Sequence, residues 1–162
     1  MKASKKGTTK TLSGEQQIKG FIAKYEPEYQ RLIVSVRRAL RKRFPTADEL
    51  VYNYPNAFVI AYSPTERGSD AVVAISAAAN GLRLVFNQGP TLPDPKELLQ
   101  GSGKQTRSIW VESAKTLALA EIEALMRAAL DHAKTPLRQS GRGELIIEPS
   151  SPKKRPTRKA RR

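Results

Sequence analysis

Two short apolar segments on either side of Asn80-Gly81 constrain the fold of this chain more than any other feature. Residues 71–77 and 82–86 are rich in Ala, Val, Leu and Ile, and Asn-Gly is the dipeptide that best fits a two-residue hairpin turn. A third segment of this kind covers residues 57–62. Strands that follow one another through short connections pair most simply as antiparallel neighbours, so the sequence predicts a three-stranded β-meander.

Helical patterns precede this meander. Ser13 is placed to cap a helix over residues 14–25, with Gln16 as a weak capping-box partner. Pro27 suits the first turn of a second helix, which Pro45 ends. The second helix has one apolar face, formed at three- and four-residue steps by Tyr29, Leu32, Ile33, Val36, Leu40 and Phe44.

The second half of the chain adds a short helix, a strand and a closing helix. Asp94 is placed to cap a helix over residues 95–100, and Gly101 follows where a left-handed residue would end it. Residues 107–112 are predicted to form a strand, and residues 117–133 an amphipathic helix. The predicted fold class is therefore α+β, with N-terminal helices, an antiparallel meander of about four strands, a short helix and a C-terminal helix.

The formal net charge of +14 is concentrated at the two ends of the chain. Residues 1–14 contain four basic residues and no acidic one, and residues 149–162 contain seven and none, which leaves +3 between them. We therefore predict a disordered basic tail over residues 1–14, one domain over residues 15–133, and a mostly disordered basic tail over residues 134–162. Within that last part, only ELIIE at residues 144–148 is apolar enough to be ordered.

Several classes of site and location are excluded by residue counts. The chain has no cysteine, so disulfides and thiol catalysis are excluded. Its single histidine, His132, rules out a Cys/His zinc site and fits a cation at a helix C-terminus. No apolar run reaches the roughly 20 residues of a membrane helix, and MKASKKGTTK lacks the apolar centre of a secretory signal. We expect a cytoplasmic protein without a membrane segment or a cofactor.

The segment LLQGSGKQTR, residues 98–107, contains GSGK and raises the question of a phosphate-binding loop. Such a loop needs a strand, then GxxxxGK[ST], then a helix, whereas this segment leaves a predicted helix and enters a predicted strand. Leu98 stands where the first glycine is required, and Gln105 stands where Ser or Thr would bind magnesium. We interpret the segment as a structural turn.

A ligand site is the alternative interpretation of this turn. Its exposed amides and two cations would suit a carboxylate or phosphate, and they belong to Gly101, Ser102, Gly103, Lys104 and Arg107. Glu66 and Arg67 lie in another predicted loop, where a local ion pair is the simplest interpretation. If the two loops met in space, they would form one polar site. The sequence leaves both interpretations open and assigns no catalytic residue.

SPTERGSDAV at residues 63–72 and LPDPKELLQGSGKQTRSIWVESA at residues 92–114 resemble one subgroup of the YdhG-like domain family, which is grouped with the frataxin-like superfamily. Most members of this family have no assigned function. The resemblance covers roughly residues 18–133 and leaves both tails outside. It implies helices before and after a β-meander, and it implies no catalytic residues. The chain departs from the broader family at residues 53–58, where Asn replaces the glycine of a Gly-x-Pro-x-aromatic pattern.

The frataxin-like link implies iron binding as one possible function. Iron would require clustered carboxylates, but the second helix sets Glu26 and Glu28 against six basic residues, namely Arg31, Arg37, Arg38, Arg41, Lys42 and Arg43. We therefore interpret the carboxylates as solvated and structural, and we predict no metal site.

The C-terminal segment SSPKKRPTRKARR is the best candidate for contact with DNA, RNA or another polyanion. Its basic residues are Lys153, Lys154, Arg155, Arg158, Lys159, Arg161 and Arg162. Such a segment binds phosphates without reading sequence, although a purely solubilising end is equally open. Trp110, Tyr52, Tyr54 and Tyr62 are predicted to pack in the core, with base stacking beside an arginine as the alternative.

The residues, together with this resemblance, predict a non-enzymatic, YdhG-like binding module with weak nucleic-acid affinity through its basic tails. The alternatives are a frataxin-like iron-binding or iron-chaperone protein and a protein-interaction scaffold.

Overall fold

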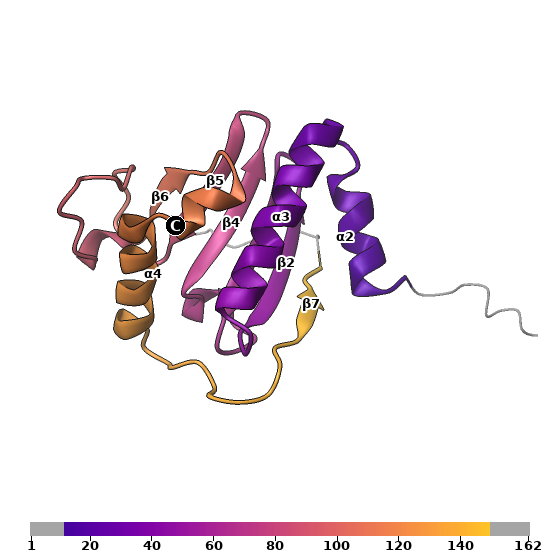
Figure 1. The fold of residues 1–162 in the computed structure, drawn as a ribbon. Coiled ribbons are helices and arrows are strands. Elements are labelled where there is room, and N and C mark those ends of the chain that lie inside the picture. The colour runs from indigo at the N-terminus through magenta and orange to yellow at the C-terminus, as the bar shows by residue number, and fades with distance from the viewer. Residues whose placement is uncertain (1–11, 150–162) are drawn as a thin grey trace, which may run out of the picture.

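A six-stranded sheet carries three α-helices on one of its faces in the computed structural model, which describes residues 12–149 (Figure 1). The helices are α2 (Gly14–Ile22), α3 (Pro27–Arg43) and α4 (Ala120–His132). The strands are β2 (Asp48–Tyr54), β3 (Ala57–Ser63), β4 (Val73–Ala78), β5 (Gly81–Phe86), β6 (Arg107–Trp110) and β7 (Leu145–Ile147). Short 3₁₀ segments are η1 (Gly68–Asp70), η2 (Gly89–Thr91) and η3 (Ala114–Ala118). The predicted α+β class is confirmed.

The strands lie in the order β6-β5-β4-β3-β2-β7 across the sheet. β3 to β6 form the predicted antiparallel meander, which β2 extends by one further antiparallel strand, and β7 joins the other side of β2 in parallel. The β4–β5 hairpin turns at Ala79-Asn80, one residue earlier than predicted, because Gly81 already pairs with Ala78. Gly81 has a φ of 137°, which glycine adopts without strain.

The predicted helix starts are confirmed at both N-terminal helices. Ser13 caps α2, and the capping box is complete: the Gln16 amide donates to Ser13 Oγ at 3.1 Å, and the Ser13 amide donates to Gln16 Oε1 at 2.9 Å. α3 begins at Pro27 and ends before Phe44, whose amide still donates to the Leu40 carbonyl. These starts follow from local chemistry alone, since a cap or a proline acts within one turn.

Residues 95–100 form a turn, not the predicted short helix. Asp94 does act as a cap, because its carboxylate accepts hydrogen bonds from the amides of Leu98 at 2.8 Å and Leu99 at 2.9 Å. Glu97, however, has a φ of 55°, which lies outside the right-handed helical region. The bonds to Asp94 therefore close a loop instead of starting a helix.

Two strands are additional to the predicted set, and one predicted helix is divided. β2 lies directly after α3 in a segment for which the sequence analysis expected no strand. β7 falls within the ELIIE segment, so the sheet extends past residue 133, further than the predicted domain. The predicted helix over residues 117–133 begins as η3 and continues as α4.

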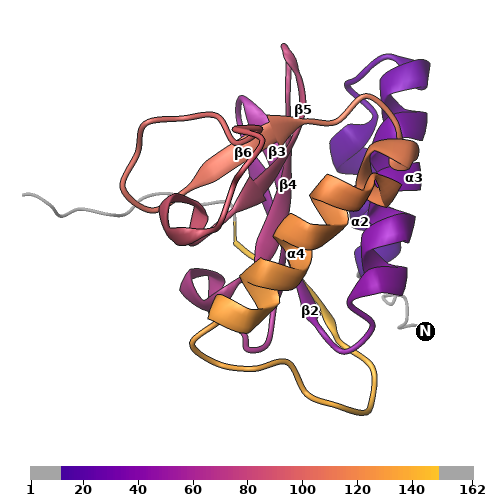
Figure 2. The ribbon, with the colours of Figure 1, turned by 60° about the vertical axis from the view of Figure 1, so that its left-hand side comes forward.

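The main core lies between the helices and one face of the sheet. α3 contributes Ile33, Val36 and Leu40, each at most 1% exposed, as its apolar face predicted. Figure 2 shows the three helices on the same side of the sheet. A smaller apolar cluster lies on the opposite face and consists of Leu50, Ala61, Ala71 and Ala74. None of the helices in the described part is both long and apolar enough to cross a membrane.

Candidate functional site

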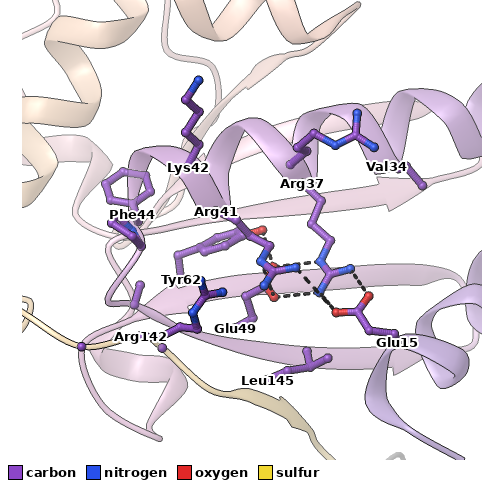
Figure 3. Close-up of a pocket in the computed structure, with 15 residues that line it drawn as sticks. Glu15, Val34, Arg37, Arg41, Lys42, Phe44, Glu49, Tyr62, Arg142 and Leu145 are labelled. Atoms are coloured by element: carbon purple, nitrogen blue, oxygen red, sulfur yellow. Dashed lines mark hydrogen bonds and ion pairs between the residues drawn. The ribbon is translucent and has the colours of Figure 1, made fainter.

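A largely buried arginine between two carboxylates forms the floor of a cleft lined by α3, β2 and the segment before β7 (Figure 3). Arg37 of α3 donates from Nε to Glu49 Oε2 at 2.9 Å and from Nη2 to Glu49 Oε1 at 2.8 Å. The same guanidinium donates from Nη1 and Nη2 to the two oxygens of Glu15, at 2.7 and 2.8 Å. Bidentate pairs of this kind are the strongest side-chain ion pairs. The floor therefore fixes α2, α3 and β2 relative to one another.

Tyr62 and Arg41 complete the polar floor. The hydroxyl of Tyr62, which is fully buried, donates to Glu49 Oε2 at 2.8 Å. Burial, together with the neighbouring Glu49 carboxylate, raises the pKa of Tyr62 well above its usual value, so the hydroxyl stays protonated as a donor. Arg41 lies 3.6 Å from a carboxylate oxygen of both Glu15 and Glu49. Two arginines thus balance two carboxylates at the floor.

The cleft above this floor has an excess of positive charge. Its volume is about 660 Å³, and three further basic residues line it, namely Arg38, Lys42 and Arg142. None of the ion pairs found within residues 12–149 involves any of these three. A concave surface with uncompensated cations attracts anions.

The backbone on both sides of Arg142 holds this residue at the cleft. The Gly143 amide donates to the Pro45 carbonyl at 3.0 Å, and the Glu144 amide donates to Asp48 Oδ1 at 2.9 Å. A Cβ on Gly143 would lie 1.7 Å from the carbonyl oxygen of Ala47, so no other residue fits this approach. The segment before β7 is therefore packed against the start of β2.

Arg41 and Arg142 are the two cations best placed to hold a ligand. Figure 3 shows the guanidinium group of Arg142, from the segment before β7, beside that of Arg41 from α3, which is turned toward the carboxylates of the floor, whereas Lys42 points away from the floor. Guanidinium groups hold phosphate and carboxylate oxygens with two parallel hydrogen bonds. The arrangement suits the binding of an anion.

The predicted loop residues Glu66 and Arg67 lie at a different, shallower pocket. That pocket is also lined by Asp48, Thr65 and Arg138. Arg67 Nε lies 3.9 Å from an oxygen of Asp70, the residue to which the Thr65 hydroxyl also donates. Arg67 therefore lies nearest to Asp70, and the local pair expected for Glu66 and Arg67 stays a prediction.

The GSGK turn leads into a strand, as predicted, and no helix follows it. Gly101 has a φ of 122°, which confirms the need for glycine there. Arg107 begins β6, and its guanidinium donates to the carbonyls of Gly103 and Thr106. Ser102 and Lys104 are exposed. Across the described residues, no hydrogen bond or ion pair joins this turn to Glu66 or Arg67, so one shared site stays a prediction.

The predicted core position of the aromatic residues is only partly confirmed. Tyr62 is fully buried and Tyr52 is partly buried, but Tyr54 is 47% exposed and Trp110 is 37% exposed. Tyr52 and Tyr54 are two residues apart on β2 and therefore share one face. The exposure of these aromatic residues depends on their position along the strand, because alternate residues of a strand face the helices or the opposite side of the sheet.

The polar floor was missed by sequence reasoning. Arg37 appeared there only as one of several cations, and Glu49 and Arg142 were not singled out. The one local signal was Gly141-Arg142-Gly143, because glycine suits a positive φ, as at Gly141, and a close backbone approach, as at Gly143. The pairing of Arg37 with Glu49 depends on how α3 lies on the sheet, which local patterns do not specify.

Residues 12–149 contain no group of three or more His, Cys, Asp or Glu side chains that could hold a metal ion. The predicted nucleic-acid contacts lie outside the described residues, namely Lys153, Lys154, Arg155, Arg158, Lys159, Arg161 and Arg162. Comparisons of the chain with protein-family models, curated proteins and solved structures found no match. The resemblance to the YdhG-like family therefore stays a prediction.

Proposed function

We propose that this protein is a non-enzymatic binding module that holds DNA, RNA or another polyanion through the basic residues at its two ends. One observation carries the proposal: residues 1–14 and 149–162 hold eleven basic residues and no acidic one, out of a net charge of +14. A cationic segment binds phosphates by releasing their counterions, so it needs no shaped groove and reads no sequence.

The arrangement of the described ends supports this proposal. Near the first described residue, Leu12, a Cβ on Gly14 would lie 2.6 Å from Leu145 Cδ2 of β7. Near the last, the Glu148 amide donates to the Val51 carbonyl at 2.8 Å. Both basic segments are therefore attached beside β7, on the side of the sheet where Arg142 lines the cationic cleft. A polyanion held by either segment would meet the other cations.

A salt titration tests the proposal. The full chain and a variant without residues 150–162 are titrated against a labelled duplex, with anisotropy as the readout. We expect the affinity of the full chain to fall with a slope of up to about −0.9 in log affinity per log salt for each phosphate contact. The truncated chain should show a flatter slope and much weaker binding.

Two control variants make this test specific. A variant with residues 150–162 in scrambled order keeps the charge and should bind as well as the full chain. A variant with Gln at the seven basic positions keeps the length and should behave as the truncated chain. Equal binding by the truncated and full chains would contradict the role of residues 150–162. It would indicate that the basic residues of α3 and Arg142 bind the polyanion instead. Absence of binding at low salt would overturn the proposed function.

The cleft supports a second candidate function, the binding of a small phosphorylated ligand. The supporting observation is the position of Arg142, which lines the cleft beside Arg41 and takes part in none of the ion pairs found within residues 12–149. Calorimetric titration with inorganic phosphate and with mononucleotides tests it. Arg142→Ala should abolish binding, whereas Arg127→Ala, an exposed arginine on α4, should have no effect. The iron-binding and scaffold alternatives stay predictions, and a ferrous-iron titration tests the first of them.

A further inference from the structure

One half of the sheet face opposite the helices is open. On this face the strand alternation places Tyr52 and Tyr54 of β2 at one edge, and Arg83 of β5 and Trp110 of β6 at the other. The long connections after β3 and β5 leave from the far end of the sheet, where Tyr62 pairs with Val73 of β4. The near end, beside the β2–β3 and β4–β5 turns, therefore carries no long connection.

The two edges of this open face present flat groups, of which Tyr54 and Trp110 are exposed and Tyr52 is half-buried, with its hydroxyl close to Gly68. The rings of Tyr52 and Tyr54 are nearly parallel, with an angle of 4° and a centroid distance of 5.8 Å. At the other edge, the guanidinium carbon of Arg83 lies 4.4 Å from the centre of the Trp110 ring. Trp110 lies against Gly81, where a Cβ would come within 2.9 Å of its ring. Each edge thus offers a planar group on which another ring can stack.

The surface between these edges is formed by small side chains. Following the register from β2 to β5, these are Ala57 and Val59 of β3 and Ser76 and Ala78 of β4. The two edges are four strand spacings apart, or about 19 Å. A flat strip of this length with planar groups at its ends accommodates several successive bases when they are unpaired. In a duplex the bases are already stacked and paired, so their flat faces are not available.

The neighbouring sequence supplies charge for the phosphates of such a strand. β7 is the edge strand next to β2, and the chain leaves the described part at Pro149, directly after Glu148 bonds to Val51. Residues 150–162 follow, with seven basic residues and no acidic one. Thirteen residues span at most about 45 Å, which is more than the width of the strip. The length of this segment therefore allows its cations to reach a strand bound across the sheet.

We propose that this open sheet face binds single-stranded nucleic acid by stacking bases on Tyr54 and on the Arg83–Trp110 pair. The inference rests on the proposed function, because the basic segments supply the contacts to phosphate. Aromatic rings and arginine planes on a sheet are a general means of holding unpaired bases. The added element is specificity: the ends bind any polyanion, whereas the sheet face distinguishes a single strand from a duplex.

Trp110 provides a direct readout, because it is the only tryptophan of the chain. The full chain is titrated with a short homopolymeric RNA or DNA strand and with a duplex of equal length, and both anisotropy and tryptophan emission are recorded. We expect both ligands to bind, with quenching of tryptophan emission by the single strand alone. Tyr54→Ala should weaken single-strand binding by about 5- to 150-fold, as stacking on one base contributes, and should leave duplex binding unchanged.

Three controls separate stacking from other causes. Tyr54→Phe keeps the ring and should bind as the wild type does. Leu119→Ala removes an exposed apolar side chain on the helix side and should have no effect. Circular dichroism establishes that each variant is folded.

The outcomes separate this inference from the proposed function. Binding of both ligands without tryptophan quenching, and without an effect of Tyr54→Ala, would overturn the inference and leave the polyanion function intact. A change in tryptophan emission on removal of residues 150–162, with no nucleic acid present, would show that this segment itself covers the face and would also overturn it. No binding of either ligand at low salt would overturn both proposals.

Discussion

Strand β2 presents Glu49 to the helices and Tyr54 to the open side of the sheet, and the two side chains differ in exposure and in their contacts. Glu49 is 5% exposed and accepts hydrogen bonds from Arg37 and Tyr62. Tyr54 is 47% exposed and lies parallel to its neighbour Tyr52. On the helix-covered face Glu49, Arg37 and Tyr62 satisfy one another's hydrogen bonds, whereas on the open face a large planar group remains in contact with solvent.

This difference indicates that the two faces respond to substitution in different ways. A change on the covered face removes partners from groups that cannot reach water, so it should act on the free energy of unfolding. A change at Tyr54 should act on ligand binding and leave the free energy of unfolding nearly unaltered, as is usual for surface positions. Measurements of both quantities on the same variants test the comparison.

Glu49→Ala should have the largest effect. It removes two hydrogen bonds from Arg37, whose side chain is 11% exposed, and the acceptor of the Tyr62 hydroxyl. Breaking a buried ion pair from one side costs about 3–5 kcal/mol. Denaturant unfolding should report a loss of this size, and a loss below about 1 kcal/mol would contradict the view that the floor is a closed network.

Glu15→Ala is the matched control for this prediction. Glu15 also pairs with Arg37, at 2.7 Å, but its side chain is 58% exposed. Water replaces a partner at such a site, so the expected cost is below about 1 kcal/mol.

Tyr62→Phe and Tyr54→Phe make the same chemical change on opposite faces. Tyr62→Phe deletes a buried donor to a carboxylate at 2.8 Å and should cost about 1.5–3 kcal/mol in the free energy of unfolding. Tyr54→Phe deletes a hydroxyl on an exposed side chain and should be close to neutral. Thermal and denaturant unfolding of the two variants measures this difference in the free energy of unfolding. Equal losses for the two variants would contradict the proposed difference between the faces.

The smallest expected effect is a pH dependence of the free energy of unfolding that arises from Glu15. Two hydrogen bonds from Arg37 lower the pKa of Glu15 below its usual value of 4.5. The folded state therefore binds this proton less readily than the unfolded chain. The ion pair of Glu15 stabilises the folded state fully when the pH is above the pKa of Glu15 in the unfolded chain. This stabilisation is lost as the pH falls through the lower pKa that Glu15 has in the folded state. The stability difference between wild type and Glu15→Gln should shrink below about pH 4.5, and a constant difference from pH 7 downward would refute the assignment.

Features that depend on a few neighbouring residues could be predicted from the sequence. Ser13, Pro27 and the turn before Gly81 act through local geometry, and all three start or end elements close to where they were expected. Asp94 shows the limit of this reasoning. Its capping bonds formed, but the positive φ of Glu97 turned the chain into a loop. A cap signal specifies which amides are bound and not whether a helix follows.

The site could not be predicted in the same way, because its residues meet through the tertiary structure. In β2, the charged Glu49 faces the helices and the apolar Tyr54 faces away, which reverses the usual pattern of a half-buried strand. The buried partner of Glu49 is twelve residues away on α3, and Arg142 arrives through β7. Tyr54 and Trp110, which are exposed, were predicted to be in the core for the same reason. Residue type alone does not indicate which face of the sheet a strand residue occupies.

The parallel strand β7 has a consequence for local opening. It pairs with β2 over three residue positions, about 96 residues apart in the chain, so it is formed by few hydrogen bonds and closes a long loop. Elements of this kind separate from a folded core at lower free energy than the core itself unfolds. Release of β7 would carry Arg142 out of the cleft and move the start of the basic segment away from Tyr52. One short strand therefore affects both the cationic cleft and the position of the basic segment, and amide exchange along β7 would report the fraction of molecules in which β7 is paired.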